Sequence, residues 1–366
     1  MNVEKICQEL SSSPLFNLSL SSKELFHSNF IDWLCNNFQE EMGNIFGPFV
    51  DNSKDKWKID RSLPEHKKID ITVYFKSGKK LIIENKVKSI PGISQLKKIS
   101  DKEGPDNSYL LLTLVPPSLM PDKWNKLTYA EFSKHLSEQL EMGGFASSSD
   151  YIKFLVTDYI QVINLLNAVV DHFSNPKHFE EDTFSNFYES LKPFKEIRID
   201  DLLIKIRYQQ ITNAVYQKLK GFFKQLDLGD KQGTIPFDTC NITTGMYNGK
   251  GSMAVNLHLP DEISVCVLID EIRFGIGVRS PNVNTTETFF ELKKREIFDI
   301  IPIENLSFVK EKRRKSNHYN YFDGRKHKYR WRYINGTVQM KDLVSNICDI
   351  VIKLKKELQA SNSKST

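Results

Sequence analysis

The sequence predicts an α/β protein in which an N-terminal domain with elements in the order α-β-β-β-α-β precedes an α+β C-terminal domain. Apolar residues recur at helical spacing over residues 22–41. Two strand-like runs, residues 69–75 and 81–87, flank a short turn that contains Gly78, which is the pattern of a β-hairpin. A change of composition at Ser174-Asn175-Pro176 marks a domain boundary. We therefore expect domains at residues 1–175 and 176–359, followed by a disordered, Ser-rich tail at 360–366.

The elements of the N-terminal domain follow from their residue patterns. Ser21 and Ser22 are good N-caps for the first long helix, which places Phe26, Phe30 and Trp33 at helical spacing. The elements expected after it are a strand (57–63), the hairpin, a helix (93–102), a strand (109–115) and two helices (129–141 and 150–173). The last helix is apolar on more than one face, which is typical of a buried helix.

The C-terminal domain begins with helices and then becomes rich in strands. Turn signals such as Asn248-Gly249 and Pro260-Asp261 separate the apolar runs. The expected elements are two helices (180–191 and 200–226), four strands (234–242, 252–257, 263–269 and 272–278) and two further helices (286–300 and 337–358).

The hairpin carries two acidic residues and one lysine where polar residues interrupt an apolar strand. Side chains alternate between the faces of a strand, so Glu84 and Lys86 point the same way, and Asp70 can join them from the neighbouring strand. Carboxylates are hard oxygen ligands for Mg²⁺ or Mn²⁺, and a neighbouring ammonium can orient water or neutralise charge on a phosphate. Such breaks in pattern are typical of functional sites. These residues therefore predict metal-dependent hydrolysis of phosphodiester bonds.

The same residues also allow a purely structural interpretation. Glu-x-Lys triplets arise by chance in a charged chain, and Glu65-His66-Lys67 is a second one, in a polar stretch after a proline. In this interpretation the strand runs out into solvent and Glu84 forms a surface ion pair with Lys86. The hairpin by itself does not separate the two interpretations.

The spacing of these residues resembles the PD-(D/E)XK nuclease superfamily, in which a hairpin supplies the aspartate and then the acid-x-lysine triplet. The resemblance is closest to a bacterial subgroup with a Glu-Leu-Phe-His-Ser helix, here residues 24–28, and a hairpin that ends Ile-Glu-Asn-Lys, here residues 83–86. The usual proline before the aspartate is absent, since Lys68-Ile69 precede Asp70. The resemblance covers residues 1–175.

The resemblance implies a restriction-endonuclease-like core with a mixed sheet and assigns a role to five residues. Asp70, Glu84 and Lys86 would form the catalytic core. Glu24, in the first helix, would complete the metal site of Asp70 and Glu84. Gln95, in the helix after the hairpin, matches a recurrent glutamine that would orient a ligand or the scissile phosphate.

Basic residues are concentrated in two segments, although the whole chain has a net charge of only +5. Residues 54–102 contain 14 Lys or Arg against 6 Asp or Glu, and residues 310–333 contain 10 against 2. Concentrated positive charge is typical of polyanion binding, whereas a lysine-rich solvated surface is the alternative. In the second segment arginines alternate with aromatic residues, which we expect to pack on the core. The candidates for nucleic-acid contact are Lys312, Arg313, Arg314, Lys315, Arg330 and Arg332.

Composition excludes several other kinds of protein. The five cysteines are scattered without paired spacing, which indicates a reducing compartment and no structural zinc. The chain has no phosphate-binding loop or dinucleotide fingerprint, and it has neither a signal peptide nor an apolar stretch that approaches a membrane span. We therefore expect a cytoplasmic protein whose one cofactor is Mg²⁺ or Mn²⁺.

The function predicted from these observations is a divalent-metal-dependent nuclease. DNA is favoured over RNA and endonucleolytic cleavage over exonucleolytic cleavage, and a role in restriction or antiviral defence is expected by analogy. A homodimer would convert two single-strand cuts into a double-strand break, and the oligomeric state stays open. The alternative is a catalytically inactive nuclease fold that serves nucleic-acid binding or assembly, although the intact Asp70, Glu84 and Lys86 argue against it.

Overall fold

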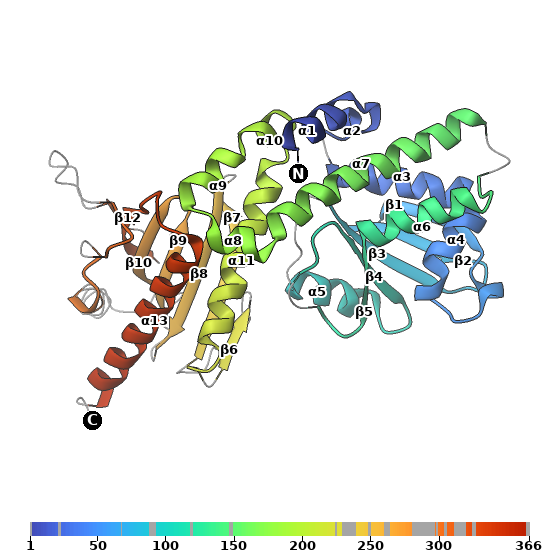
Figure 1. The fold of residues 1–366 in the computed structure, drawn as a ribbon. Helices are drawn as coiled ribbons and strands as arrows, with labels where there is room; N and C mark the ends of the chain where they lie inside the picture. The colour runs from blue at the N-terminus through green and yellow to red at the C-terminus, as the bar shows by residue number, and fades with distance from the viewer. Residues whose placement is uncertain are drawn as a thin grey trace. The chain divides into compact units, whose positions relative to one another are not determined.

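The chain divides into two compact units, which we describe separately. A computed structural model describes residues 2–20, 23–66, 68–87, 93–117, 120–145, 149–223, 225–228, 239–247, 250–259, 264–279, 297, 299–303, 306–310, 320–323 and 327–363. Unit 1 comprises Met1–Phe173 and Lys192–Leu203, and unit 2 comprises Ser174–Leu191 and Ile204–Thr366. The expected boundary after residue 175 lies close to the first of these breaks, whereas the return of Lys192–Leu203 to unit 1 was not expected. The class is mixed α/β, as predicted (Figure 1).

Unit 1 contains a five-stranded sheet with helices on both faces. Its helices are α1 (Val3–Ser12), α2 (Pro14–Ser19), α3 (Lys23–Asn37), α4 (Gln39–Phe46), α5 (Ile93–Glu103), α6 (Tyr129–Glu141), α7 (Asp150–Ser174) and α10 (Lys192–Glu196), with 3₁₀ turns η1 (Gly47–Phe49) and η2 (Lys54–Lys56). Its strands are β1 (Ile59–His66), β2 (Ile69–Phe75), β3 (Lys80–Lys86), β4 (Ser108–Thr113) and β5 (Trp124–Thr128). From α3 to β4 the elements therefore follow in the predicted order.

The sheet of unit 1 is mixed, with strand order β1-β2-β3-β4-β5. β2 pairs antiparallel with β1 and β3, whereas β4 pairs parallel with β3 and β5. Strand β5 was not predicted from the sequence, because only Trp124 and Leu127 of this short strand are buried and no alternation marks it. The expected single helix over 22–41 ends at Asn37, and a second one begins at Gln39.

Two layers of helix cover this sheet (Figure 1). α3 packs through Ile31 and Leu34, and it lies with α6 on one face. α5 lies on the other face, where Leu96 joins the core cluster of Ile82, Tyr109 and Leu111. Because β3 is a central strand and helices lie on both faces of the sheet, its apolar residues are fully buried.

Helix α7 corrects the expectation that no apolar stretch approaches the length of a membrane span. By length and composition it is apolar enough to cross a membrane, a test that the core helix of a soluble protein also meets. Its buried side chains include Tyr159 and Ile163. Tyr159 contacts His27 and Phe30 of α3 in unit 1.

Unit 2 contains a seven-stranded sheet. Its helices are α8 (Pro176–Glu181), α9 (Phe184–Ser190), α11 (Asp200–Leu219, whose first turn belongs to unit 1) and α13 (Met340–Ser363). Its strands are β6 (Gln225–Leu228), β7 (Thr239–Tyr247), β8 (Lys250–His258), β9 (Ser264–Asp270), β10 (Arg273–Arg279), β11 (Asn320–Asp323) and β12 (His327–Tyr333). The strand order is β11-β12-β10-β9-β8-β7-β6, and only the β6–β7 pair is parallel.

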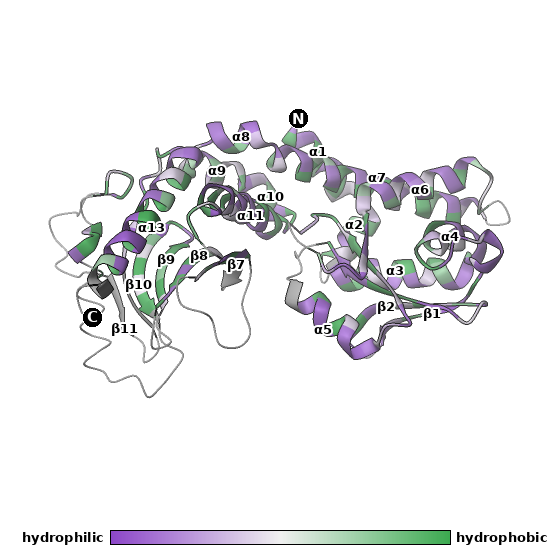
Figure 2. Cartoon of the chain, turned by 90° about the horizontal axis from the view of Figure 1, so that it is seen from below, coloured by the Kyte–Doolittle hydropathy of each residue, from purple (hydrophilic) through white to green (hydrophobic). Residues whose placement is uncertain are grey.

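Strands β9 and β10 are largely hydrophobic, as their colouring in Figure 2 shows. Val255, Val267 and Ile276 lie in adjacent strands in register and are buried. Gly251 permits a close approach of α11, because an added Cβ would lie 2.4 Å from the ring of Tyr208. The predicted helix over 200–226 is too long, because α11 ends at Leu219 and β6 begins at Gln225.

Two further expectations for unit 2 need correction. Helix α13 runs to Ser363, so the first residues of the expected disordered tail, 360–363, are helical. In β12 the arginine face was expected to be open and the aromatic face to be packed. The structure shows the reverse at two positions, because Arg332 is buried opposite Phe274 whereas Tyr333 is exposed. The predicted nucleic-acid contact of Arg332 therefore lacks an open surface.

Candidate functional site

The register of β2 and β3 brings the predicted acidic residues together. Ile71 pairs with Ile83 and Thr72 pairs with Ile82, so the same register places Asp70 opposite Glu84. Because side chains alternate along each strand, both acids and Lys86 project from one face. That face is covered by α5, whereas Ile71, Ile83 and Asn85 belong to the other.

Lys86 lies between the two carboxylates. Its Nζ lies 2.7 Å from Oε1 of Glu84 and 3.1 Å from Oδ2 of Asp70. The side chains of Glu84 and Lys86 are 3% and 8% exposed, and that of Asp70 is 18% exposed. The interpretation as a solvent-exposed ion pair is therefore wrong: the strand ends in a buried charge cluster.

The hydrogen bonds of the cluster leave one buried oxygen without a partner. Gln95 of α5 donates from Nε2 to Oε1 of Glu84 over 2.8 Å, so the predicted glutamine contacts the predicted acid. Asp70 accepts a hydrogen bond from the backbone N–H of Asn85 over 2.7 Å. Oε2 of Glu84 is buried and has no hydrogen-bond partner among the residues that the structure describes. Since buried polar atoms are almost always paired, this oxygen marks a position where a further group would bind.

The charges of the cluster are unbalanced. Burial raises the pKa of Glu84 to about 7, and the negative charges of Asp70 and Glu24 add to this effect, while Lys86 opposes it. Burial alone would lower the pKa of Lys86, but the Glu84 and Asp70 carboxylates raise it above its ordinary value. One ammonium is therefore shared by at least two carboxylates, and additional positive charge would stabilise the ionised form of Glu84.

A hydrogen-bond network on the opposite face of β3 connects the site to helix α3. Asn85 donates from Nδ2 to Oγ of Ser28 over 2.9 Å and to the backbone carbonyl of Glu24 over 3.4 Å. Its Oδ1 accepts a hydrogen bond from the hydroxyl of Tyr129 over 2.7 Å. Asn85 therefore links the strand that carries Glu84 to the first turn of α3, which carries Glu24. The alternation that places Glu84 and Lys86 on one face of β3 places Asn85 on the opposite face, but nothing in the sequence indicated its bonds to Ser28 and Tyr129.

The donor set fits a hard divalent cation. Glu84 and Asp70 offer carboxylate oxygens, which Mg²⁺ and Mn²⁺ prefer, and the unpartnered Oε2 of Glu84 lies within the cluster. Among the described residues no three acidic, His or Cys side chains form a ready ligand group. The ammonium of Lys86 lies between the two acids instead, so a cation would be held by Glu84 and Asp70 together with oxygens from water or substrate.

The predicted nucleic-acid residues of the C-terminal segment are placed only in part. Lys312, Arg313, Arg314 and Lys315 lie outside the described residues. Arg330 belongs to β12 and pairs with Ile276, and its side chain is not among those described.

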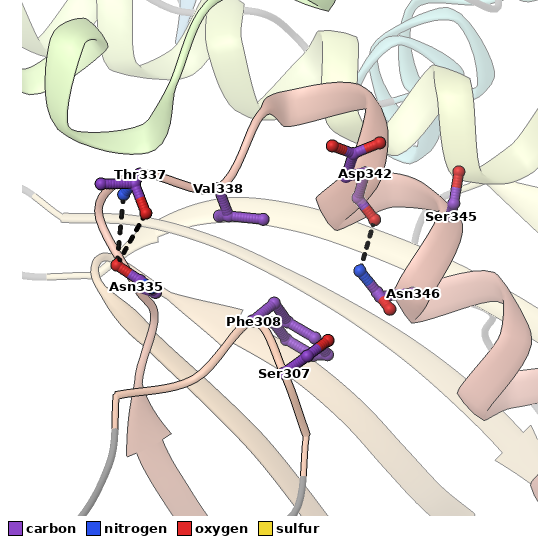
Figure 3. A pocket seen from close by; sticks show the side chains of 8 residues that line it. All are labelled: Ser307, Phe308, Asn335, Thr337, Val338, Asp342, Ser345 and Asn346. Atoms are coloured by element: carbon purple, nitrogen blue, oxygen red, sulfur yellow. Dashed lines mark hydrogen bonds between the residues drawn. The ribbon is translucent and has the colours of Figure 1, made fainter.

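A pocket in unit 2 offers little comparable chemistry (Figure 3). It has a volume of about 480 Å³ and is lined by Ser307, Phe308, Asn335, Thr337, Val338, Asp342, Ser345 and Asn346. Asn335 accepts hydrogen bonds from the backbone and hydroxyl of Thr337, and Asn346 donates to the carbonyl of Asp342. These amide groups are engaged within the chain, and the lining contains one carboxylate and no cationic side chain.

Comparisons with known proteins add no assignment. No family model matches the chain, and neither a curated protein nor a solved structure matches it. The geometry of the cluster at the β2–β3 hairpin is therefore the main indication of function.

Proposed function

We propose that the protein is a divalent-metal-dependent nuclease with a restriction-endonuclease-like core in unit 1. The observation that carries this proposal is the buried cluster of Glu84, Lys86 and Asp70, in which one acid retains an unpartnered oxygen. A surface ion pair contributes little to stability and is easily replaced, whereas burying two carboxylates around one ammonium is costly. Such a cost is expected where the charges serve chemistry.

The residues of the cluster would have distinct roles. Glu84 and Asp70 would hold Mg²⁺ or Mn²⁺, which when bound supplies Lewis-acid polarisation of the scissile phosphate. Lys86, already within hydrogen-bonding distance of both acids, would stabilise negative charge that develops on the phosphate oxygens. Gln95 would hold Glu84 in place through its 2.8 Å hydrogen bond. Glu24 would contribute a further negative charge to cation affinity.

The proposed substrate is DNA. Residues 54–102 surround the cluster in sequence and carry 14 basic residues against 6 acidic ones, which favours a polyanionic ligand. Duplex and single-stranded substrates would both bring phosphates to a strand end that bears carboxylates and one lysine. A cytoplasmic role in restriction or antiviral defence is part of the same proposal.

The test is cleavage of supercoiled plasmid and of single-stranded DNA and RNA with Mg²⁺, with Mn²⁺ and with excess EDTA. We expect DNA cleavage that EDTA abolishes. The matched control pair is Glu84→Gln against Glu103→Gln, because Glu103 also binds a lysine of β3, Lys80, over 2.9 Å but lies outside the cluster. Cleavage that survives EDTA, or equal activity in both variants, would contradict the proposal. Metal binding without cleavage of any substrate would favour an inactive nuclease fold.

A further inference from the structure

Tyr333, the last residue of strand β12, lies between two basic residues and pairs with Arg273 of β10. On its other side, Val309 forms a bridge with Ile334. The backbone N–H of Lys310 donates to the carbonyl of Tyr333 over 2.8 Å, so Lys310 lies opposite Tyr333. Opposite residues of an antiparallel pair share a face, with Cβ atoms about 5 Å apart. Arg273, Tyr333 and Lys310 therefore form one row, from three segments that are far apart in the sequence.

The same face carries a second aromatic side chain, because Trp331 precedes Tyr333 by two residues in β12. The ring centroids of Trp331 and Tyr333 lie 5.1 Å apart, edge to face. The guanidinium of Arg273 lies 4.6 Å from the centroid of the Trp331 ring. In β10 the residue in register with Trp331 is Gly275, which has no side chain to cover the indole. Aromatic rings and basic groups therefore lie side by side at this end of the sheet.

The row is accessible and carries more positive than negative charge. Tyr333 is 41% exposed, the side chain of Arg273 is 37% exposed, and Lys310 is exposed. Asp270 of β9 is opposite Arg273, and its Oδ2 lies 3.7 Å from Nη1, which is a loose ion pair. Nε of Arg273 has no hydrogen-bond partner among the described residues. Lys310 also begins the basic segment 310–333, in which 10 Lys or Arg stand against 2 acidic residues.

This combination of side chains suits a ligand that is both planar and anionic. Nucleic-acid bases stack on aromatic rings, and phosphates contact the basic residues that flank them. An acidic peptide would satisfy the basic residues but would offer the rings no planar group. In a duplex the bases are already stacked on each other, whereas single-stranded nucleic acid presents free base faces and phosphates together. Single-stranded nucleic acid therefore fits this surface best.

We propose that Tyr333 and Trp331, with Arg273 and Lys310 beside them, form a stacking surface for single-stranded nucleic acid. This surface is the reverse of the one expected from the sequence, in which the arginines of β12 contact the ligand and its aromatic residues pack on the core. The inference goes beyond the proposed function, because it assigns a ligand to unit 2 and requires neither a metal ion nor cleavage.

The test is binding of a fluorescein-labelled oligo-dT of about 12 nucleotides to the full-length protein in excess EDTA, measured by fluorescence anisotropy. We expect Tyr333→Ala to raise the Kd about tenfold, which is the effect of one lost base stack. Tyr333→Phe keeps the ring and should bind within about twofold of the unaltered protein. Tyr151→Ala is the matched control, since Tyr151 is a 68% exposed tyrosine of α7 in unit 1, and it should also bind within about twofold.

An abasic oligonucleotide of the same length separates base stacking from phosphate contact. Tyr333→Ala should bind it as the unaltered protein does. Lys310→Ala should weaken binding of both oligonucleotides and should reduce the slope of log affinity against log salt by about 0.7, the contribution of one phosphate contact in a single strand. Oligo-dT should also quench tryptophan emission, and Trp331→Phe should lose this quenching.

Three results would each overturn the inference. The first is binding of oligo-dT by Tyr333→Ala within about twofold of the unaltered protein. The second is equal weakening of oligo-dT and abasic binding in Tyr333→Ala, which would mean that the surface accepts any polyanion, an acidic peptide included. The third is the absence of quenching that depends on Trp331, which decides the matter even if circular-dichroism melts show that Tyr333→Ala is unfolded. None of these results bears on Mg²⁺-dependent cleavage, so the proposed function of unit 1 is tested separately.

Discussion

Each unit buries a group of polar side chains on its sheet, and the two groups are satisfied in different ways. In unit 2, His258 bonds Ser264 Oγ through Nδ1 over 2.9 Å and Asn241 Oδ1 through Nε2 over 2.7 Å. In the neighbouring cross-strand pair of β8 and β9, Cys266 donates from Sγ to Oδ1 of Asn256 over 2.9 Å. In unit 1, Glu84 and Lys86 are similarly buried and Asp70 is 18% exposed, but one ammonium serves two acids, and Oε2 of Glu84 has no partner among the described residues.

This is the difference expected between a polar group that only supports the fold and the functional site proposed for unit 1. Neutral side chains can bond to each other with no excess charge, so the cluster of unit 2 needs nothing further to be stable. The cluster of unit 1 retains repulsion between acids and an unpaired oxygen, each of which lowers the stability of the protein alone. Burial is common to both clusters, so the imbalance of charge is the feature that supports the proposed site in unit 1.

The largest expected effect is on cleavage. Asp70→Ala or Glu84→Ala should reduce Mg²⁺-dependent turnover by at least about 100-fold, because removal of a metal ligand costs several kcal/mol of transition-state stabilisation. Single-turnover assays at saturating Mg²⁺ would measure this loss, with circular dichroism to verify folding. Asn241→Ala, in the neutral cluster, should leave turnover within about threefold. Full activity of either acid variant would remove the distinction between the two clusters.

A second effect concerns the lysine. Lys86→Ala leaves Glu84 and Asp70 buried without their cation, and loss of one member of a buried pair costs about 3–5 kcal/mol. The free energy of unfolding in EDTA should fall by this amount and should recover in part when Mg²⁺ is added. Lys80→Ala, which removes the more exposed partner of Glu103 on the same strand, should cost about 1 kcal/mol or less. Equal losses in the two variants would mean that Lys86 is an ordinary ion-pair residue.

Truncation of Asn241, in the neutral polar cluster of unit 2, should lower the stability of the protein. Asn241→Ala leaves the imidazole of His258 without the acceptor at Nε2, and an unpaired buried donor costs about 1–3 kcal/mol. Urea denaturation followed by circular dichroism would measure the change. A stabilised variant would show that the polar group of unit 2 also carries strain and is not merely structural.

The last predicted effect is a gain in stability instead of a loss. Because the pKa of Glu84 is raised from 4.5 to about 7, the folded metal-free protein binds more protons than the unfolded chain between these values, and its stability falls as the pH rises through them. Glu84→Gln abolishes this titration and leaves Lys86 paired with Asp70. In EDTA, the stability of the variant relative to the unaltered protein should therefore be about 2–3 kcal/mol greater at pH 8 than at pH 5. A gain that is independent of pH would exclude ionisation of Glu84 as its cause.

The sequence was sufficient to predict those features that depend on the local periodicity of side chains. Alternation along residues 69–75 and 81–87 predicted both strands, and the common side of Glu84 and Lys86 followed from it. Gln95 also lies where expected, on the helix after the hairpin. These features depend on neighbours a few residues apart, which is the range over which side-chain periodicity is informative.

The features that the sequence did not reveal depend on long-range pairing. The row of Arg273, Tyr333 and Lys310 follows from pairing between segments that are far apart in the sequence, which no local pattern indicates. The alternating arginines and aromatics of β12 define two faces but not which face is covered, so Arg332 was assigned to the wrong side. The helix that continues to Ser363 has a polar end that composition alone cannot distinguish from a tail.

The triplet Glu84-Asn85-Lys86 also affects how the sheet assembles. A slip of β3 by one residue would exchange its faces, placing both charges among Tyr129 and Ser28 and moving the amide to the side of α5. Such a register would bury two ions without compensation and would lose the bonds of Asn85. The residues proposed for chemistry thus disfavour misregistered folding, and variants that neutralise both Glu84 and Lys86 would lose part of this discrimination against alternative strand pairings.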